Sequence, residues 1–322
     1  MPLLEVRDLK THFHTKRGVV KAVNGVSFTV DEGETLGLVG ESGSGKTITG
    51  LSVLRLVPEP AGRIVGGQVL FNGEDLLRKS KTEMQRYRGK HLSIILQDPM
   101  SSLNPVLTIG YQVGEGVILH QGAKWDKTLW EIVSDLMRQV RIPAPESRLS
   151  DYTHQYSGGM RQRIVGAIAI ACQPHLLIAD EPTTALDVTI QAQYLNLLKE
   201  IQKQRKLSML FITHDFGVVA KMCTKVAVMY AGRIVEMAEV RQIFNHPSHP
   251  YTKGLMLSVP KVDQEVERLF SIEGHPPDLT NLSSQCSFLP RCIEKMEVCG
   301  REEFPPEVNV GDGHVVRCWR YV

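Results

Sequence analysis

The chain has 322 residues, of which 42% are hydrophobic, and a formal net charge of +2. This length and composition allow one large globular core with an appended region. The near-neutral charge argues against a nucleic-acid-binding protein and against a surface drawn to acidic lipid.

No segment has the pattern of a secretion signal or a membrane span. The first residues, MPLLEVRDLK, lack the apolar run of a secretory signal. The longest purely apolar stretches run for about nine residues, as at 164–172, whereas a membrane-spanning helix needs about 20. We therefore expect a soluble or peripheral protein of the cytosol.

The first part of the chain alternates strand and helix patterns. Residues 4–30 alternate apolar and polar positions, which predicts antiparallel strands. A short apolar run at 35–40 ends in a glycine-rich turn, and the helical pattern that follows it stops at Pro58. Residues 66–76 predict a strand and a turn.

Three further apolar runs, at 92–98, 175–180 and 208–215, have the length of buried strands. Helical stretches separate them, which predicts an α/β fold with a largely parallel sheet covered on both faces. Residues 99–160 contain an amphipathic helix at 128–140, and we expect them to form a helical subdomain inserted in the core.

After about residue 240 the composition changes to loops that carry Pro, His and Gly. We therefore predict two domains, 1–240 and 241–322. Cys172 and Cys223 stand alone in apolar surroundings, where small buried hydrophobes are expected. The other four cysteines crowd near the end of the chain: Cys286, Cys292, Cys299 and Cys318.

In a reducing cytosol, such a cluster is more often a metal site than a pair of disulfides. The spacing C-x5-C-x6-C-x18-C lacks the C-x2–4-C pairs of typical zinc modules. Four thiolates also suit a [4Fe–4S] cluster. A [4Fe–4S] cluster, zinc and no metal at all remain open on spacing alone. The nearby histidines, His246, His249, His275 and His314, are interpreted as loop residues.

The segment GESGSGKT at 40–47 fits the phosphate-binding pattern G-x-x-x-x-G-K-[ST]. Its glycines let the backbone curl so that N–H groups face phosphate oxygens, and the helix that follows presents its positive end to the same phosphates. Lys46 should reach the β- and γ-phosphates of ATP, and the Thr47 hydroxyl should bind Mg²⁺.

Two acids follow the apolar strand LLIAD. Asp180 is the expected partner of Mg²⁺, and Glu181 could polarise the attacking water. The segment SGG at 157–159 precedes a strongly helical run, which makes a second anion-binding helix terminus. Since the chain has one P-loop, this terminus is best explained as a cap on the γ-phosphate held by a partner subunit. An ordinary capped helix is the alternative.

With Gln97, the loop Ala185-Leu186-Asp187 and His214, these motifs stand in one order. Over roughly residues 3–240 the sequence resembles a nucleotide-binding subunit of an ATP-binding-cassette (ABC) transporter. The resemblance implies an ABC-type P-loop NTPase with a RecA-like α/β core, an antiparallel β-subdomain and an inserted helical subdomain. It also implies that two such domains close head-to-tail on two ATP molecules and reopen after hydrolysis.

The resemblance implies roles for single residues. Gln97 would sense Mg²⁺ and water, His214 would hold the γ-phosphate and the attacking water, and Asp187 would bridge the dimer. The implied catalytic residues are Glu181, His214 and Gln97, and the implied Mg²⁺ ligands are Thr47, Gln97 and Asp180. The implied nucleotide-binding residues are Gly40, Ser42, Gly43, Ser44, Gly45, Lys46, Thr47, Ile48, Phe13, Arg17, Ser157, Gly158, Gly159 and Asp187.

The signature motif departs from the family pattern, and more than one residue could stack on adenine. The common signature LSGGQ has Tyr156 and Met160 at its outer positions, and Met160 cannot hydrogen-bond as Gln would. For stacking on adenine the candidates are Phe13, His14 and, as a cation–π substitute, Arg17. Phe13 is preferred, although it could equally be a core residue of its strand.

Several stretches resemble the dipeptide/oligopeptide-importer branch of this family: 97–105, 157–163, 178–193 and 246–255. Peptide and nickel importer subunits carry a C-terminal extension with a similar RC…C…C pattern, and that likeness points to a [4Fe–4S] cluster of structural role.

The resemblance implies an ATPase that powers uptake of dipeptides or oligopeptides from the cytoplasmic face of the inner membrane. Its partners would be two transmembrane permease subunits, a second related ATPase chain and, indirectly, an extracytoplasmic peptide-binding protein, without nucleic acid. The alternatives are the same motor for nickel or another small solute, and a soluble ABC ATPase of DNA repair or translation.

Overall fold

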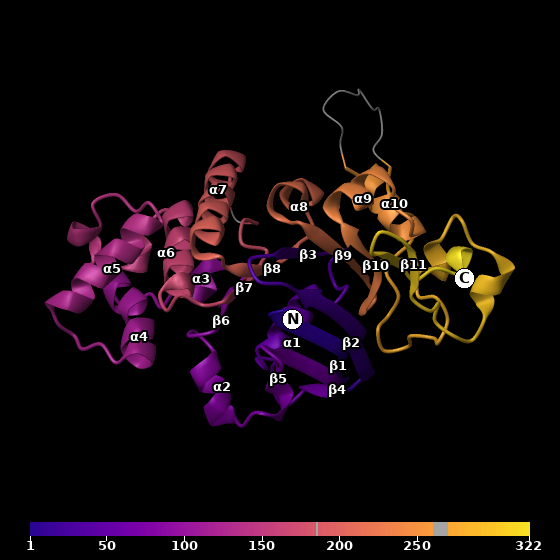
Figure 1. The fold of residues 1–322 in the computed structure, drawn as a ribbon, viewed down its shortest axis with the longest axis horizontal. Helices are drawn as coiled ribbons and strands as arrows, with labels where there is room; N and C mark the ends of the chain where they lie inside the picture. Colours follow the sequence, from indigo (N-terminus) through magenta and orange to yellow (C-terminus); the bar gives the residue numbers. More distant parts are fainter. Residues whose placement is uncertain (185, 260–269) are drawn as a thin grey trace. The chain divides into compact units, whose positions relative to one another are not determined.

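The computed structural model describes residues 1–184, 186–259 and 270–322. The chain divides into two compact units (Figure 1). The first unit comprises Met1–Val30, Thr35–Leu77 and Phe211–Val322, and the second comprises Asp31–Glu34 and Arg78–Leu210. Each unit is described by itself.

The first unit contains a four-stranded antiparallel sheet. Its order is β2-β1-β4-β5, with bounds β1 (Leu4–Thr15), β2 (Gly18–Val30), β4 (Gly62–Phe71) and β5 (Glu74–Asp75). The prediction of antiparallel strands over 4–30 is confirmed, because Leu4 pairs with Val30 and Thr15 with Gly18. The turn between β4 and β5 has positive φ at Asn72 and Gly73, a conformation that these two residue types tolerate best.

A second set of strands in the first unit has the order β11-β12-β10-β9-β3. Their bounds are β3 (Thr35–Val39), β9 (Lys225–Tyr230), β10 (Arg233–Glu239), β11 (Val308–Gly311) and β12 (His314–Val316). Only β3 and β9 are parallel, whereas β9–β10, β10–β12 and β11–β12 are antiparallel. The sequence did not predict the strands β9 to β12, of which β9 extends the parallel part of the sheet and β10, β11 and β12 add an antiparallel part.

The helices of the first unit are α1 (Lys46–Val53), α8 (Phe216–Met222), α9 (Val240–Asn245) and α10 (Pro250–Leu257). Its hydrophobic core joins residues far apart in the sequence. Val39 of β3, Val228 of β9, Tyr251 of α10 and Phe288 belong to one buried cluster. The C-terminal region therefore contributes side chains to the same core as the strand that leads into the P-loop.

The second unit contains the parallel pair β6 (Leu92–Ile95) and β7 (Leu176–Asp180), in which Leu92 aligns with Leu176. The strand predicted at 92–98 ends before Gln97, which lies in the loop that follows. β8 (Ser208–Thr213) is divided between the two units at residue 210.

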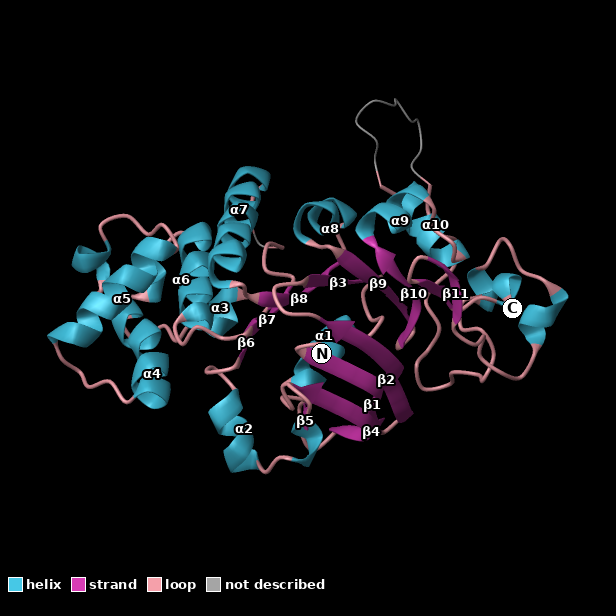
Figure 2. Cartoon of the chain, viewed as in Figure 1, coloured by secondary structure: helices cyan, strands magenta, loops and turns pink. Residues whose placement is uncertain are grey.

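The rest of the described second unit is mainly helical (Figure 2). Its helices are α2 (Lys81–Tyr87), α3 (Pro99–Ser102), α4 (Ile109–Gln121), α5 (Lys127–Gln139), α6 (Gly158–Ile170) and α7 (Val188–Arg205). α5 is the predicted amphipathic helix, and it buries Leu129, Val133 and Met137. α6 contacts α3, α4 and α5, so the helix that follows the SGG motif lies within this helical layer.

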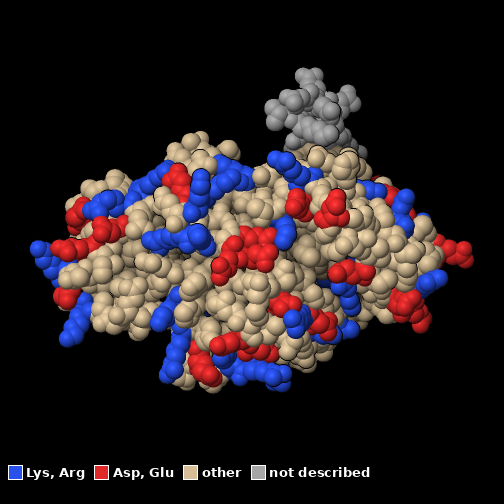
Figure 3. All heavy atoms as spheres, in the orientation of Figure 1, with Lys and Arg blue, Asp and Glu red and all other residues tan. Residues whose placement is uncertain are grey.

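Basic and acidic side chains are interspersed on the face drawn in Figure 3, in keeping with the small net charge. Among the described residues, no helix is both long enough and apolar enough to cross a membrane.

Candidate active site

The P-loop connects β3 to α1 in the first unit. Gly40, Gly43 and Gly45 have φ values of +154°, +78° and +104°, which side-chain-bearing residues rarely adopt. A Cβ at Gly40 would lie 2.1 Å from the Met229 carbonyl oxygen, and one at Gly45 would lie 2.2 Å from that of Ala22. The tight turn therefore requires glycine at these two positions for both backbone conformation and space.

Lys46 is buried, and its ammonium group donates to the carbonyl oxygens of Gly40 at 2.8 Å and Glu41 at 2.9 Å. These bonds draw the lysine back across its own loop. Ser44 is also buried, whereas Ser42 and Thr47 are exposed. The first turn of α1 contains Lys46, Thr47 and Ile48, so the N-terminal end of this helix lies at the loop, as the motif predicts.

In the second unit, the carboxyl end of β7 brings two predicted catalytic residues together. The Gln97 side-chain amide donates to the Glu181 carboxylate at 3.0 Å, and the Thr184 hydroxyl donates to the same oxygen at 3.0 Å. Glu181 has a φ of +43°, which is unusual for a residue with a side chain and signals a backbone held by its surroundings. Asp180, the last residue of β7, is only 2% exposed.

The signature motif forms the N-terminal end of α6. Ser157 is the N-cap residue and its hydroxyl accepts from the Met160 N–H at 3.3 Å, as expected of a serine at a helix start. A Cβ at Gly158 would meet nothing within 4 Å, whereas one at Gly159 would lie 2.7 Å from Ile190 of α7. Gly158 therefore leaves an open approach to this helix end, while Gly159 allows α6 and α7 to pack closely.

The two departures from the common signature have different settings. Tyr156 is buried, and its hydroxyl donates to the Arg148 carbonyl oxygen at 3.4 Å, so tyrosine fills an interior position with a polar partner. Burial raises the pKa of Tyr156 to about 12, which keeps the phenol protonated. Met160 supplies the N–H that Ser157 caps.

Asp187 and His214 occupy helix starts. Asp187 is the N-cap of α7 and accepts from the Ile190 N–H at 3.0 Å. Ala185, two residues before Asp187, lies outside the described residues. His214 belongs to the first unit, is exposed and directly precedes Asp215, the N-cap of α8.

The adenine-stacking candidates lie on or beside β1. Phe13 is half-buried and pairs with Val20 on β2 and Gly62 on β4. A Cβ at Gly62 would lie 2.7 Å from the Phe13 ring, so this ring packs against the glycine. His14 and Arg17 are exposed, with Arg17 in the turn between β1 and β2.

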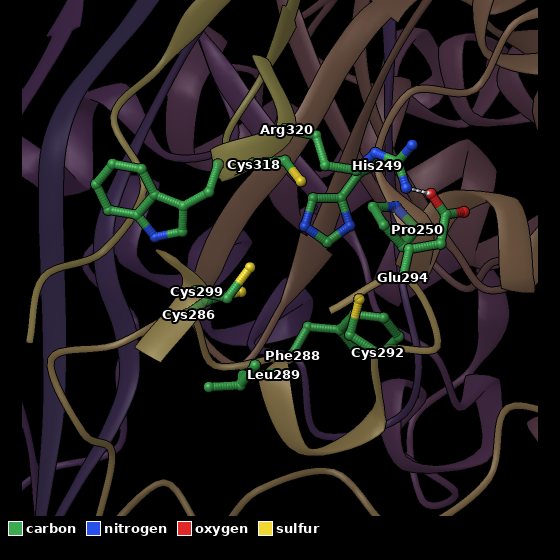
Figure 4. Close-up of a pocket in the computed structure, with 11 residues that line it drawn as sticks. His249, Pro250, Cys286, Phe288, Leu289, Cys292, Glu294, Cys299, Cys318 and Arg320 are labelled. Carbon is green, nitrogen blue, oxygen red and sulfur yellow. Dashed lines mark hydrogen bonds and ion pairs between the residues drawn. The ribbon is translucent and has the colours of Figure 1, made fainter. Parts of the chain in front are cut away.

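The four C-terminal cysteines line one small cavity of about 10 Å³. The sulfur atoms of Cys286, Cys292, Cys299 and Cys318 point into it (Figure 4). His249, Phe288 and Trp319 complete its lining. Burial, with a smaller contribution from the neighbouring cysteines, raises the pKa of Cys286 to about 11. Within the described ranges, no group of three or more His, Cys, Asp or Glu side chains is arranged to hold a metal ion.

The isolated cysteines and the nearby histidines have other roles. Burial raises the pKa of Cys223 to about 12, as expected for an inert thiol. His249 caps α10 by accepting from the Tyr251 N–H at 3.0 Å. The interpretation of His314 as a loop residue is wrong, because it lies in β12 and pairs with buried Glu236 at 2.7 Å.

Comparison with known proteins gives this arrangement its family. Residues 23–184 match the model described as ABC transporter, and residues 235–299 match the model described as oligopeptide/dipeptide transporter, C-terminal region. The chain belongs to the ABC transporter family.

Its relatives in this family match along almost the whole chain. It is 50% identical to the probable peptide ABC transporter ATP-binding protein y4tR of Sinorhizobium fredii, over 99% of this chain and 95% of that protein. It is 48% identical to the dipeptide transport ATP-binding protein DppD of Bacillus subtilis, over 98% and 94%. It is 49% identical to the oligopeptide transport ATP-binding protein OppD of the same species, over 98% and 88%.

Solved structures show the ABC ATPase cassette fold. The dimeric structure of the cassette MJ0796 bound to ADP and Pi has a TM-score of 0.66 and 21% identity, over 74% of this chain and 99% of that one. CbiO1 from Clostridium perfringens has a TM-score of 0.64 and 23% identity, over 76% and 91%. At these identities the likeness shows the fold alone.

The sequence of this ABC transporter family member did not reveal every residue at the site. Thr184, which shares the Glu181 carboxylate with Gln97, lies inside the stretch 178–193 that resembles the importer branch, but its role was not inferred. The contact between Glu41 of the P-loop and Arg291 of the C-terminal region was also missed. The RC pattern at 291–292 indicates a cysteine ligand, but it carries no signal for the role of the arginine beside it.

Proposed function

We propose that this chain is the ATPase subunit of a bacterial peptide importer, which hydrolyses ATP to power uptake of dipeptides or oligopeptides. The observation that carries the proposal is near-complete coverage by relatives named for dipeptide and oligopeptide transport, including the separate C-terminal match at 235–299. The start of that match also supports a division of the chain near residue 240 into a cassette and a C-terminal extension.

Each P-loop residue has a task in the proposed reaction. The loop N–H groups and the N-terminal end of α1 bind the phosphates, and Lys46 exchanges its loop carbonyls for β- and γ-phosphate oxygens. Gly40 and Gly45 keep the turn tight enough for this approach, and Ser42, Gly43, Ser44 and Ile48 complete the binding surface. Phe13 or Arg17 contacts the adenine.

The hydroxyl of Thr47, the amide of Gln97 and the carboxylate of Asp180 supply oxygen ligands of the kind that Mg²⁺ prefers. Asp180 suits this role because its backbone is fixed as the last residue of a buried strand. When bound, Mg²⁺ neutralises charge that develops on the phosphates.

Glu181 accepts a proton from the attacking water, and His214 orients that water and the γ-phosphate. The bond from Gln97 to Glu181 supports this assignment, because it ties the base to the loop expected to sense the metal and the membrane-facing subdomain. If Gln97 turned to Mg²⁺, this bond would be released and the Glu181 carboxylate would gain freedom to act on water.

Two ATPase chains complete each other's sites. The end of α6, with Ser157, Gly158 and Gly159, caps the γ-phosphate bound by the partner, and Asp187 bridges the pair. The open space at the Gly158 Cβ position supports this role. Two permease subunits would hold the ATPase pair at the cytoplasmic face of the inner membrane, and an extracytoplasmic binding protein would deliver peptide to them.

Replacing Glu181 with Gln tests the ATPase assignment. We expect ATP hydrolysis by the assembled transporter to fall at least about 100-fold, because the general base is lost while ATP binding is kept. Glu200→Gln is the matched control, since Glu200 pairs with Arg141 on the surface of the same unit. Normal phosphate release from the Glu181→Gln transporter would overturn this role for Glu181.

The cargo is tested in vesicles that contain the full transporter and its binding protein. Labelled dipeptides and oligopeptides should accumulate in an ATP-dependent manner. Accumulation of nickel without peptide would instead assign the same motor to the metal.

We also propose that Cys286, Cys292, Cys299 and Cys318 hold a [4Fe–4S] cluster with a structural role, with zinc as the alternative. Convergence of all four thiols on one cavity supports this donor set, and thiolates are the ligands that both groups take. Bound, the cluster would cross-link a region with few strands. Broad absorbance near 400 nm that is lost in Cys286→Ser would support the iron–sulfur cluster. Stoichiometric zinc without this absorbance would assign the site to zinc instead.

A further inference from the structure

Glu41 is the one acidic residue of the P-loop, and the C-terminal region holds it at two points. The Arg291 guanidinium donates to both carboxylate oxygens of Glu41, at 2.7 and 3.0 Å. The Tyr251 hydroxyl accepts from the Glu41 N–H at 2.8 Å. A P-loop residue is thus fixed through its side chain and its backbone by residues 210 and 250 positions away.

Arg291 is built rigidly into this position. Its side chain is only 5% exposed, and all three guanidinium nitrogens donate. Besides Glu41, the acceptors are the carbonyl oxygens of Glu273 and Ile272 and the Tyr230 hydroxyl. The bond to Glu41 raises the pKa of Arg291, which keeps it charged. An arginine whose three guanidinium nitrogens all donate, two of them to one carboxylate, fixes the orientation of that carboxylate and offsets its charge.

The C-terminal region also lines a cavity beside the P-loop. Pro276, Pro277 and Leu279 line a cavity of about 200 Å³ together with Glu41–Ser44 and Tyr230. The Leu279 carbonyl accepts from the Lys21 N–H at 3.1 Å, which attaches this segment to β2. The 276–279 segment and Arg291 therefore meet the P-loop from the same region of the chain.

A carboxylate in a loop that binds phosphates weakens that binding, because its negative charge repels the negatively charged ligand. Glu41 is also the residue whose carbonyl oxygen accepts from Lys46. Its side-chain charge and its backbone orientation therefore bear on the phosphate site directly. Arg291 offsets the charge and fixes the orientation.

We propose that Arg291 is a positioning residue for nucleotide binding: it neutralises Glu41 and thereby makes the P-loop accept a nucleoside triphosphate. This inference rests on the proposed ATP-binding function and adds a requirement for the C-terminal region in it. Its signature is dependence on ligand charge, because an unpaired Glu41 repels ATP more strongly than ADP, and ADP more strongly than AMP.

The test is nucleotide titration of the full-length chain by calorimetry in buffer that contains Mg²⁺. We expect Arg291→Gln to raise the Kd for ATP about tenfold, that for ADP less, and that for AMP about twofold at most. Arg291→Lys should retain much of the affinity for ATP because it keeps the charge. The double variant Arg291→Gln/Glu41→Gln should return to within about threefold of wild type, because it removes the charge that Arg291 offsets.

Arg7→Gln is the matched control. Arg7 makes an equally bidentate pair with Glu5 in the same unit, at 2.7 and 2.8 Å, and neither residue lines the cavity beside the P-loop. It should leave the affinity for all three nucleotides unchanged. Thermal unfolding of each variant reports whether it is folded.

Equal loss of affinity for ATP, ADP and AMP in Arg291→Gln, or a double variant as weak as Arg291→Gln, would overturn the inference. If Arg291→Gln does not fold, Glu41→Gln alone decides: it should bind ATP at least as tightly as wild type, and selective weakening of ATP would overturn the inference. A wild-type chain that binds no nucleotide would refute the proposed function itself.

Discussion

Glu181 combines a strained backbone with a shared carboxylate. Its φ of +43° falls where side-chain-bearing residues are uncommon, and one of its oxygens accepts from both Gln97 and Thr184. Strain of this kind persists only when the surrounding structure enforces it, and it gathers at functional positions. The orientation of the proposed base is therefore set by the turn after β7 and by two neutral donors.

A substitution at Gly158 should reduce activity without reducing the stability of the fold. The Cβ position of this glycine is open, so Gly158→Ala should change the free energy of unfolding by less than about 1 kcal/mol. The added methyl would stand between the α6 terminus and the phosphate of the partner subunit, so ATPase activity of the assembled transporter should fall at least about tenfold. Thermal unfolding and phosphate release measure the two effects.

Gly159→Ala is the contrasting variant, because its Cβ would lie 2.7 Å from Ile190 and must disturb the contact of α6 with α7. It should lower the unfolding temperature as well as the activity. Full activity of Gly158→Ala would show that this glycine does not approach a phosphate.

At the scale of elements, β10 anchors two later segments through one buried carboxylate. Glu236 accepts from the N–H groups of Ser248 and His249, at 2.6 and 3.0 Å, and pairs with His314 of β12 at 2.7 Å. Burial alone would raise the pKa of Glu236, but the bond to His314 and the two backbone bonds outweigh it and hold that pKa below its usual value.

Glu236→Ala should therefore destabilise the chain by about 3–5 kcal/mol at neutral pH, because it leaves buried donors without their acceptor. The depressed pKa sets the sign of the pH dependence. Stability from Glu236 is present above the unfolded pKa of about 4.5 and is lost as pH falls through the lower folded pKa. Urea unfolding at several pH values measures this, and the wild-type advantage over Glu236→Ala should shrink in acid. A pH-independent difference would contradict the role of the charge.

The sequence predicted elements whose signals are local. The P-loop glycines, the cap at Ser157 and the amphipathic helix α5 follow from neighbouring residues, and the structure has them where the patterns put them. The alternating apolar positions likewise predicted the hairpin of β1 and β2.

Contacts between distant segments could not be predicted in the same way. The pairing of β10 with β12 and the contact of Arg291 with Glu41 join residues about 80 and 250 positions apart. A single sequence shows the residue types at both ends but not their proximity. The short strands β11 and β12 are hard to predict for a related reason, since the hairpin that they form joins the sheet through the pairing of β12 with β10, about 80 positions earlier.

At the scale of the whole molecule, the C-terminal region and the cassette strands share one core within the first unit. The Phe288 ring meets the rings of Tyr230 and Tyr251, with centroids 5.3 and 5.4 Å away, and all three side chains are buried. Tyr230 ends β9, which pairs with the strand that leads into the P-loop. The first unit should therefore unfold as one cooperative body that includes the C-terminal region.

Phe288→Ala tests this cooperativity. Loss of a buried aromatic side chain costs about 3–5 kcal/mol. We expect native-state hydrogen exchange to show a similar loss of protection for amides of β9 and of β12, because both depend on the same core. Ile293→Ala is the control from the same region: Ile293 is 80% exposed, so its truncation should change protection by less than about 0.5 kcal/mol. If Phe288→Ala lowered protection in β12 but left β9 unchanged, the C-terminal region would unfold independently. The contact of Arg291 with Glu41 would then join two independently unfolding parts of the chain, rather than belong to one rigid nucleotide site.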